Sequence, residues 1–173
     1  MSLDNYKTLL KKVDEKFKAI HSAHSSQMQC KRGCSQCCVS GLSVFEVEAE
    51  NISRHLKTHP EILKKLESET QAQGSCNFLT SEGACAVYEV RPVICRSQGA
   101  PLKIKDSDSA TPLDACPLNF ENTNLEDLLN SQDFFDLNHL NTLLVLINQQ
   151  FTEKKDNNAK RISLTSLTDS TKK

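Results

Sequence analysis

The run Cys30-Lys-Arg-Gly-Cys34-Ser-Gln-Cys37-Cys38 places four cysteines within nine consecutive residues. In a helical conformation Cys30, Cys34 and Cys37 would share one face, and Cys38 would lie about 100° away from Cys37. Gly33 fits a loop or a broken turn equally well. Adjacent thiols seldom close on one small ion without strain. The Cys37-Cys38 pair therefore favours a bridge between two sites, or one ligand beside a thiol outside the ligand set.

The other four cysteines are spread along the chain, and none lies on the apolar stripe of a predicted helix, where a structural thiol would usually be found. Thiolates are soft donors that suit zinc or iron–sulfur clusters rather than magnesium or calcium. The sequence therefore predicts a metal centre. Its candidate ligands are Cys30, Cys34, Cys37, Cys38, Cys76, Cys85, Cys95 and Cys116.

The spacing leaves the number and type of sites open. Eight thiols could form two tetrahedral four-sulfur sites, or one four-thiolate cluster with spare residues. The spacing matches neither a zinc ribbon nor the ferredoxin run C-x2-C-x2-C-x3-C-P. Cys34-Ser-Gln-Cys37 matches a redox C-x-x-C, although a long helix precedes it instead of the βαβ context of thioredoxin-like proteins. A thiol redox switch is therefore an alternative.

Composition bounds the protein class. The 173 residues predict about one domain. The formal net charge of −1 argues against a strongly basic nucleic-acid binder. Hydrophobic residues make up 38%, with nine aromatic residues (two tyrosines and seven phenylalanines) and no tryptophan. This is a thin core for the length, so we expect the metal to help hold the fold.

No segment has the composition of a membrane span or a secretory signal. The longest apolar run, Leu143 to Ile147, is far short of the roughly 20 residues that a spanning helix needs. Charged residues interrupt the N-terminal region where a signal's apolar stretch would lie. We therefore expect a cytoplasmic protein with reduced thiols, a metal ion as its partner, and neither nucleic acid nor membrane. The sequence does not identify a protein partner.

Four amphipathic segments predict a mainly α fold with about four main helices around a cysteine-rich centre. The first begins at a Ser2 cap and has the apolar stripe Leu3, Tyr6, Leu10, Val13, Phe17 and Ile20. The second begins near Val44, with Ser43 and Glu46 as a capping box, and buries Phe45, Ala49, Ile52 and Leu56. The third follows His59-Pro60, buries Ile62, Leu63 and Leu66, and ends at Gly74. The fourth runs from about Ser131 to Phe151, with the stripe Leu137, Leu140, Leu144, Ile147 and Phe151, widened by Leu143 and Leu146.

The remaining segments are short or polar. Residues 76 to 88 predict a short β-hairpin, and Arg91-Pro92 predicts a short turn or helix after it. Residues 103 to 114 predict a surface loop, which lacks the glycine and glutamate of a calcium loop. We expect one domain over residues 1–151, with the metal motifs within 28–120. A polar, flexible tail would follow over residues 152–173, in which Ile162, Leu164 and Leu167 can dock one short turn.

Basic residues next to the cysteines bear on the charge of the site. Four thiolates on Zn²⁺ carry a net charge of −2, which nearby guanidinium groups would offset. Arg91 and Arg96, near Cys95, are candidates for this role, as are Lys31 and Arg32 in the first run. The alternative is a set of solvated surface residues.

Other residues with chemistry of their own have simpler interpretations. Tyr88 is predicted to be a core anchor with a hydrogen-bonded hydroxyl. His55 and His59 have the i,i+4 spacing of a metal pair but lack the glutamate of H-E-x-x-H, so we interpret them as surface residues. The same holds for His21, His24 and His139. The sequence assigns no catalytic residue.

The cysteines and their neighbours together resemble a known family. Cys30 to Cys38, Cys76-Asn-Phe-Leu, and Cys85-Ala-Val-Tyr88-Glu-Val-Arg91-Pro92-Val-Ile-Cys95-Arg96 are similar to the CxxCxxCC cysteine-cluster family, which is described as a zinc- or iron-chelating domain. The resemblance covers roughly residues 28 to 120. One departure is C-x3-C between Cys30 and Cys34, where the family name has C-x2-C.

The resemblance implies metal binding more directly than any reaction. It implies a protein that holds zinc or iron through its cysteines, with a [4Fe-4S] cluster as one form. The same broader group includes a flagellin lysine methylase, so an iron–sulfur enzyme or electron carrier is the alternative from another class.

Overall fold

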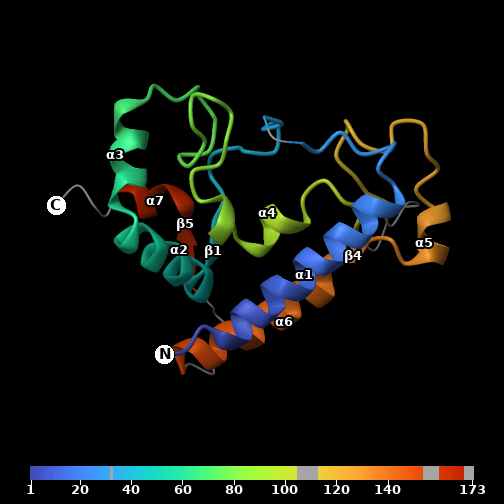
Figure 1. Cartoon of the computed structure of the whole chain (residues 1–173). Coiled ribbons are helices and arrows are strands. Elements are labelled where there is room, and N and C mark those ends of the chain that lie inside the picture. The colour runs from blue at the N-terminus through green and yellow to red at the C-terminus, as the bar shows by residue number, and fades with distance from the viewer. Residues whose placement is uncertain (32, 105–112, 154–159, 170–173) are drawn as a thin grey trace. The chain divides into compact units, whose positions relative to one another are not determined.

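The computed structural model describes residues 1–31, 33–104, 113–153 and 160–169. Four helices of these residues have at least seven residues: α1 (Asp4–Ala23), α2 (Glu46–Thr58), α3 (Pro60–Ser68) and α6 (Leu137–Thr152) (Figure 1). The shorter helices are η1 (Tyr88–Val90), α4 (Val93–Ser97), α5 (Asp127–Ser131) and α7 (Leu164–Asp169). The strands are β1 (Ser43–Phe45), β2 (Leu102–Lys103), β3 (Leu113–Asp114), β4 (Phe135–Asp136) and β5 (Arg161–Ser163). The prediction of a mainly α fold is confirmed.

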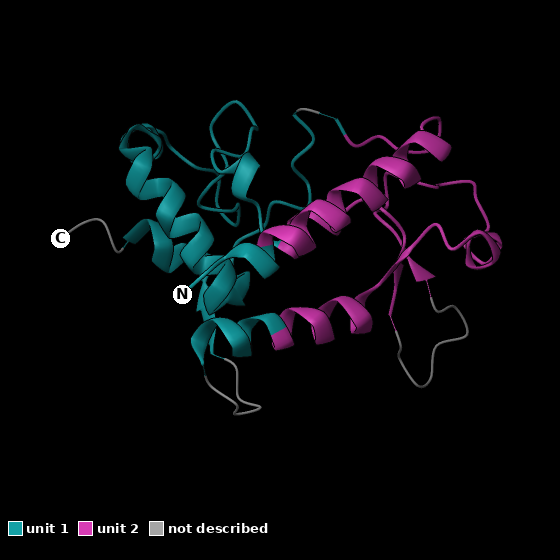
Figure 2. Cartoon of the chain, turned by 60° about the horizontal axis from the view of Figure 1, so that its bottom comes forward, with its two compact units in different colours: residues 1–6, 31–92, 147–173 teal, residues 7–30, 93–146 magenta. Residues whose placement is uncertain are grey.

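The chain forms two compact units, coloured separately in Figure 2. Unit 1 consists of residues 1–6, 31–92 and 147–173, and unit 2 consists of residues 7–30 and 93–146. The predicted single domain over residues 1–151 stays a prediction. The division separates the cysteines, since unit 1 carries five and unit 2 carries three.

Helix α2 is the centre of unit 1, where it contacts α3, α7 and η1. The predicted burial of Phe45, Ala49, Ile52 and Leu56 is confirmed, although Phe45 belongs to β1 and precedes α2. The core of this unit consists of Val44, Ala49, Ile52, Leu56, Leu66, Phe78, Val87 and Leu164. Ile62 and Leu63 of α3 pack against it, as predicted.

The end of the chain completes this core. Strand β5 pairs antiparallel with β1, with Val44 opposite Ile162. The Leu164 backbone N–H donates to the Leu42 carbonyl at 2.9 Å, and the Leu164 side chain is 5% exposed. Ile162 and Leu167 pack against the same core, so the prediction that Ile162, Leu164 and Leu167 dock a short turn is confirmed.

The first helix follows its predicted pattern. The stripe residues Leu3, Tyr6, Leu10, Val13 and Ile20 are buried. The Ser2 hydroxyl accepts a hydrogen bond from the Asp4 backbone N–H at 3.1 Å, as a capping side chain does. Within unit 2, α1 also contributes charged groups. Asp14 pairs with the buried Arg96, and the Lys16 ammonium lies 5.7 Å from the Phe135 ring centroid.

Three predicted helix boundaries are wrong. Helix α2 does not begin at a Ser43 capping box, because Ser43 pairs with Ser163 in a strand, and the Glu48 carboxylate instead accepts from the Phe45 N–H at 3.0 Å. Helix α3 ends at Ser68, before Gly74, which adopts φ +81° in a later turn. Helix α6 begins at residue 137 instead of 131, because β4 and the left-handed Gln132 precede it.

Other predicted segments are partly confirmed. The hairpin at residues 76 to 88 is a tight turn with one isolated bridge, between Leu79 and Cys85, and residues 88–90 are 3-10 helix instead of strand. The loop predicted at residues 103 to 114 begins and ends in β2 and β3, and its residues 105–112 lie outside the described residues. Leu146 does not widen the buried face of α6, since it is 51% exposed.

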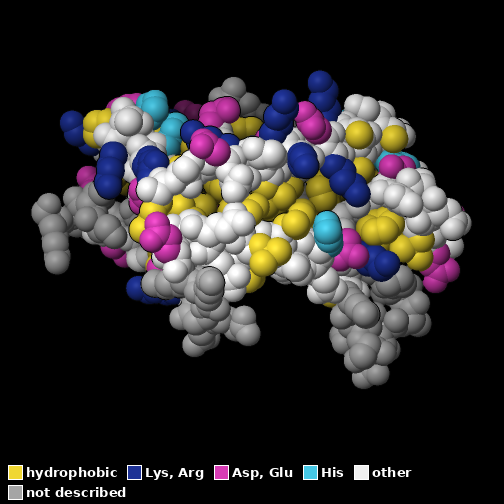
Figure 3. Space-filling model, turned by 90° about the horizontal axis from the view of Figure 1, so that it is seen from below, with side chains coloured by type: hydrophobic (Ala, Val, Ile, Leu, Met, Phe, Trp, Pro, Cys, Tyr) yellow, Lys and Arg dark blue, Asp and Glu magenta, His cyan; other side chains and the backbone are white. Residues whose placement is uncertain are grey.

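The surface carries charges of both signs. On the face shown in Figure 3, lysine and arginine side chains are interspersed with aspartate and glutamate side chains. This distribution fits the net charge of −1. Among the helices of the described ranges, none combines the length and apolar character that a membrane crossing requires.

Candidate metal centre

Two cysteine-bearing segments of unit 1 lie side by side. The Cys76 backbone N–H donates to the Cys38 carbonyl at 2.9 Å, and the Ser40 N–H donates to the Gly74 carbonyl at 2.9 Å. Val39 and Ser75 form an antiparallel bridge between these bonds. The ladder brings the Cys37-Cys38 pair next to Cys76, although about forty positions of sequence separate them.

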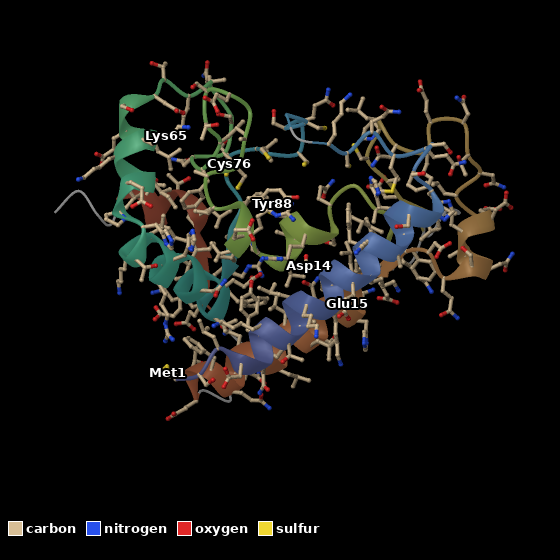
Figure 4. All side chains as sticks on the ribbon, in the orientation of Figure 1. Met1, Asp14, Glu15, Lys65, Cys76 and Tyr88 are labelled. Carbon is tan, nitrogen blue, oxygen red and sulfur yellow. The ribbon has the colours of Figure 1, made fainter. Side chains whose placement is uncertain are left out.

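A tight turn adds Cys85 to this arrangement. The Thr80 N–H donates to the Ala84 carbonyl and the Ala86 N–H donates to the Phe78 carbonyl, both at 2.8 Å. Phe78 is buried in the core, and Cys76 and Cys85 pack against that core. Figure 4 shows Cys76 on the loop that follows α3. Cys85 also lines a surface pocket, together with Ile62 and Ala86.

The first cysteine run contacts the same turn. A Cβ atom placed on Gly83 would lie 3.5 Å from the Gly33 carbonyl oxygen and 4.0 Å from the Ser35 hydroxyl. Cys34 stands between Gly33 and Ser35 in the chain. The turn that ends at Cys85 therefore lies against the segment that carries Cys34.

The thiols of unit 1 interact electrostatically. A hydrogen bond from the Cys38 side chain lowers the pKa of Cys37 to about 6, against the opposing effect of burial. The same hydrogen bond raises the pKa of Cys38, and burial and the negative charges of Cys37, Cys85 and Cys76 raise it further. Burial raises the pKa values of Cys76 and Cys85. Cys37, Cys76 and Cys85 are therefore all close enough to Cys38 to influence its pKa.

A guanidinium group balances part of this negative charge. Arg91 lowers the pKa values of Cys37 and Cys85 by electrostatic attraction, as a lesser cause in each. Its Nε donates to the Tyr88 carbonyl at 3.1 Å, and its guanidinium carbon lies 3.6 Å from the Tyr88 ring centroid. The predicted charge-balancing role of Arg91 fits this geometry. The prediction that Tyr88 is a core anchor is wrong, because Tyr88 is 56% exposed and stacks with Arg91.

Unit 2 carries Cys30, Cys95 and Cys116. Cys95 is part of α4, and the Cys116 carbonyl accepts from the Asn119 N–H at 2.8 Å. The Asn119 side-chain amide donates to the Cys30 sulfur at 3.2 Å. All eight cysteines of the chain are free, with Cys37 exposed and the other seven partly buried. None is a core thiol.

The comparison with protein families adds an independent finding. Residues 29–117 match the CxxCxxCC family, which carries the description "Putative zinc- or iron-chelating domain". The chain belongs to the CxxCxxCC family. The match spans more than half of the chain and includes all eight cysteines. No curated protein and no solved structure matches the chain significantly.

The description of the CxxCxxCC family supports metal binding, and the donors of unit 1 fit the metals it names. Five thiols lie in one small unit, four of them interact electrostatically, and an arginine offsets their charge. Soft thiolates in such a set suit zinc or iron. Within the described ranges, no three His, Cys, Asp or Glu side chains already stand in an arrangement that would hold a metal ion.

The predicted convergence of seven or eight cysteines at one centre stays a prediction. The structure brings Cys37, Cys38, Cys76 and Cys85 together, with Cys34 in the adjoining segment. Cys30, Cys95 and Cys116 belong to unit 2.

The other residues singled out in the sequence have separate surroundings. Arg96 is not a solvated surface residue, because it is 8% exposed and pairs with Asp14. Arg32 lies outside the described residues. The His55 and His59 rings stack with their centroids 4.2 Å apart. His24 is not simply a surface residue, since its Nε2 lies 2.9 Å from an Asp133 carboxylate oxygen.

The sequence interpretation did not identify Asn119. This residue is 3% exposed and contacts the Cys30 sulfur. A buried asparagine needs partners for its amide, but the sequence shows only its position three residues after Cys116. Asparagine is favoured in turns, which is the signal that this position offers.

Proposed function

We propose that this protein holds zinc or iron through its clustered cysteines, and that the donors in unit 1 are Cys38, Cys76 and Cys85 with Cys34 or Cys37 as the fourth. The observation that carries the proposal is the meeting of the Cys38 segment, the Cys76 segment and the Cys85 turn in unit 1, and the influence of the other three cysteines on the pKa of Cys38 agrees with it. Thiols gathered on loops outside the core offer soft donors, which suit zinc or iron.

The backbone supports the same set. Cys38 and Cys76 are joined by a backbone hydrogen bond, and Cys85 lies on the turn that follows. Loss of protons from these thiols on metal binding would create a concentrated negative charge, which Zn²⁺ or iron neutralises directly and Arg91 neutralises in part. The role of the metal would be structural, since it would cross-link three segments that isolated bridges and single backbone hydrogen bonds join to one another.

The choice of fourth donor follows from the strain argument. Adjacent ligands seldom close on one ion, so Cys34 is the better partner if Cys38 is a ligand. Cys37 would then remain beside the site as a thiol neighbour. Cys30, Cys95 and Cys116 are proposed as ligands as well, in the part of the chain that forms unit 2.

Metal analysis of anaerobically purified protein tests this function. The wild type should carry stoichiometric zinc or iron, and Cys38→Ser should lose metal because one position of a tetrahedral site opens. Cys34→Ser should lose more metal than Cys37→Ser. The control is Leu144→Ala, which removes a buried side chain (4% exposed) and should destabilise the fold without changing the metal content. Metal retained in full by Cys38→Ser would reject the proposed donors.

The colour of the purified protein distinguishes a zinc site from an iron–sulfur cluster. A colourless protein with stoichiometric zinc supports a structural site. A brown protein with broad visible absorption supports an iron–sulfur cluster, and with it the proposal of an enzyme or electron carrier. A metal-free protein whose thiols oxidise reversibly would support a thiol redox switch instead.

A further inference from the structure

The Asn119 side chain in unit 2 uses all of its main hydrogen-bonding groups. Its Oδ1 accepts from the Gln29 backbone N–H at 2.7 Å. Its Nδ2 donates to the Gly99 carbonyl at 2.6 Å and to the Cys30 sulfur at 3.2 Å. The side chain is 3% exposed, so these partners replace water almost completely.

These bonds join the three segments of unit 2 that carry cysteines. Gln29 precedes Cys30, and Gly99 lies four positions after Cys95. The Asn119 backbone N–H closes a turn onto the Cys116 carbonyl at 2.8 Å. One buried amide therefore fixes the chain next to Cys30, the chain that follows Cys95, and the turn that begins at Cys116.

Gly99 shows how closely the Cys30 sulfur is seated. A Cβ atom at position 99 would lie 2.5 Å from the Cys30 sulfur and 3.5 Å from the Asn119 Nδ2. Gly99 also has φ +100°, which favours glycine. The absence of a side chain at this position leaves the space that the sulfur and the amide occupy.

Two of the three side-chain hydrogen bonds have a structural role, since they satisfy the backbone N–H of Gln29 and the backbone carbonyl of Gly99. The third bond is directed at a sulfur, which is a weak acceptor as a thiol and a stronger one as a thiolate. Hydrogen bonds to ligand sulfurs orient the ligand and tune the metal.

We propose that Asn119 is a positioning residue that holds Cys30 as a thiolate metal ligand in unit 2. The inference rests on the proposed function, because it assumes that the cysteines hold a metal. It assigns to Asn119 a role toward the metal in addition to its role in joining the loops. Cys95 and Cys116, on two of the joined segments, are the further donors of unit 2.

The test uses the full chain loaded with zinc. Asn119→Ala removes all three side-chain bonds, and Asn119→Asp keeps an acceptor for the Gln29 N–H while lacking both amide hydrogens. Asn148→Ala is the matched control, because Asn148 is a buried asparagine (1% exposed) whose Oδ1 accepts from the Val47 N–H in unit 1. Zinc affinity is measured by competition with a chelator, and alkylation of each cysteine is measured by peptide mapping.

We expect both Asn119 variants to bind the zinc of unit 2 about 10- to 100-fold more weakly than the wild type does. A loss of this size is typical when the hydrogen-bond partner of a metal ligand is removed. Alkylation of Cys30 in the zinc-loaded protein should become faster, while alkylation of Cys38 stays as in the wild type. Asn148→Ala should leave both readouts unchanged. If Asn119→Ala does not fold by circular dichroism, Asn119→Asp decides the outcome.

Zinc affinity within about twofold of the wild type, with Cys30 still protected, would overturn the role of Asn119 and leave the proposed function intact. An effect in Asn148→Ala as large as in Asn119→Ala would also overturn it, because the loss would then reflect stability alone. A wild-type protein that binds no zinc or iron would instead reject the proposed function itself.

Discussion

Gly99 is the residue at which packing and backbone conformation act together. Its φ of +100° strains any other residue, and an added Cβ would lie 2.5 Å from the Cys30 sulfur. Gly41 has a similar φ of +82° with nothing within 4 Å of an added Cβ. Substitution of Gly41 therefore reports backbone strain alone, whereas substitution of Gly99 reports backbone strain together with a steric clash.

We expect Gly41→Ala to lower the free energy of unfolding by about 1–2 kcal/mol through backbone strain. Gly99→Ala should cost more than that, because the sulfur or the backbone must also move. Urea unfolding of both variants, with the slope of each transition checked against the wild type, measures the difference. Equal losses would show that the Cys30 sulfur yields freely to an added methyl group.

The thiols of unit 1 predict how zinc affinity depends on pH. The pKa values of Cys38, Cys76 and Cys85 are raised, so these groups are protonated at neutral pH in the metal-free protein. The pKa of Cys37 is lowered to about 6, so this group is already a thiolate at pH 7. Zinc must displace protons from the first three groups, and lower pH therefore opposes binding.

Zinc affinity should accordingly rise between pH 6 and pH 8 by up to about tenfold per pH unit for each thiol that loses a proton. Competition with a chelator of known pH dependence measures this change. An affinity that stays constant over this range would contradict thiol ligands with raised pKa values.

At the residue scale, candidate ligands are easier to identify from the sequence than the residues that surround them. Cysteine is a metal-ligating residue type wherever it stands in a sequence, and Arg91 lies in the same short block as Cys85 and Cys95, so both could be singled out as candidates from local sequence. Tyr88 and Asn119 depend on contacts instead. Stacking with Arg91 leaves Tyr88 on the surface, and Asn119 reaches Cys30 across 89 positions of sequence, so local sequence cannot show either.

At the scale of elements, periodicity predicted the long helices, while pairing with distant segments set their ends. The stripe of α1 is local, and it was predicted correctly. The predicted start of α2 is wrong because Ser43 pairs with Ser163, a partner 120 positions away. The predicted beginning of α6 is wrong because Phe135 pairs in parallel with Leu102. Such short strands follow from tertiary packing instead of propensity.

Mutation can distinguish the observed cap of α2, which uses Glu48, from the predicted cap, which uses Ser43. Glu48 is 2% exposed and accepts from the Phe45 N–H, so Glu48→Ala should lower the free energy of unfolding by about 0.5–2 kcal/mol. Ser43→Ala should have a smaller effect, because its hydroxyl accepts a long hydrogen bond, 3.5 Å, from the Nε of the exposed Arg161. Thermal unfolding of the two variants makes the comparison, and a larger loss for Ser43→Ala would restore the capping box that the sequence predicts.

Helix α7 provides a second test at this scale. Leu164 is 5% exposed within the core of unit 1, so Leu164→Ala should cost about 2–5 kcal/mol of unfolding free energy. Leu146→Ala is the control, because Leu146 is 51% exposed and a surface substitution usually stays within about 0.5 kcal/mol. Chemical denaturation measures both. Similar small effects would mean that the end of the chain adds little to the core.

At the scale of the whole molecule, the division into units limits what the sequence could predict about the site. The spacing of the cysteines is compatible with one centre or two. The structure places Cys37, Cys38, Cys76 and Cys85 in one neighbourhood through a ladder and a turn. No periodicity in the sequence encodes that ladder, because it consists of isolated bridges between irregular segments.

Metal removal is the prediction that belongs to this scale. In unit 1 the segments around Cys38, Cys76 and Cys85 are joined by isolated bridges and single backbone hydrogen bonds. A structural zinc contributes about 10–16 kcal/mol of apparent binding free energy in small peptides, against about 5–15 kcal/mol for the whole stability of a typical domain. Removing the metal should therefore loosen or unfold the chain.

Strong chelation should reduce the helical circular dichroism and lower the thermal midpoint. The Cys38→Ser protein, treated in the same way, should change less, because it has already lost metal. This comparison excludes a direct effect of the chelator on the polypeptide, which would alter both proteins equally. Helical circular dichroism that survives chelation in the wild type would show that the protein core, including α2 and its neighbours, is stable by itself and that the metal has a role other than holding the fold.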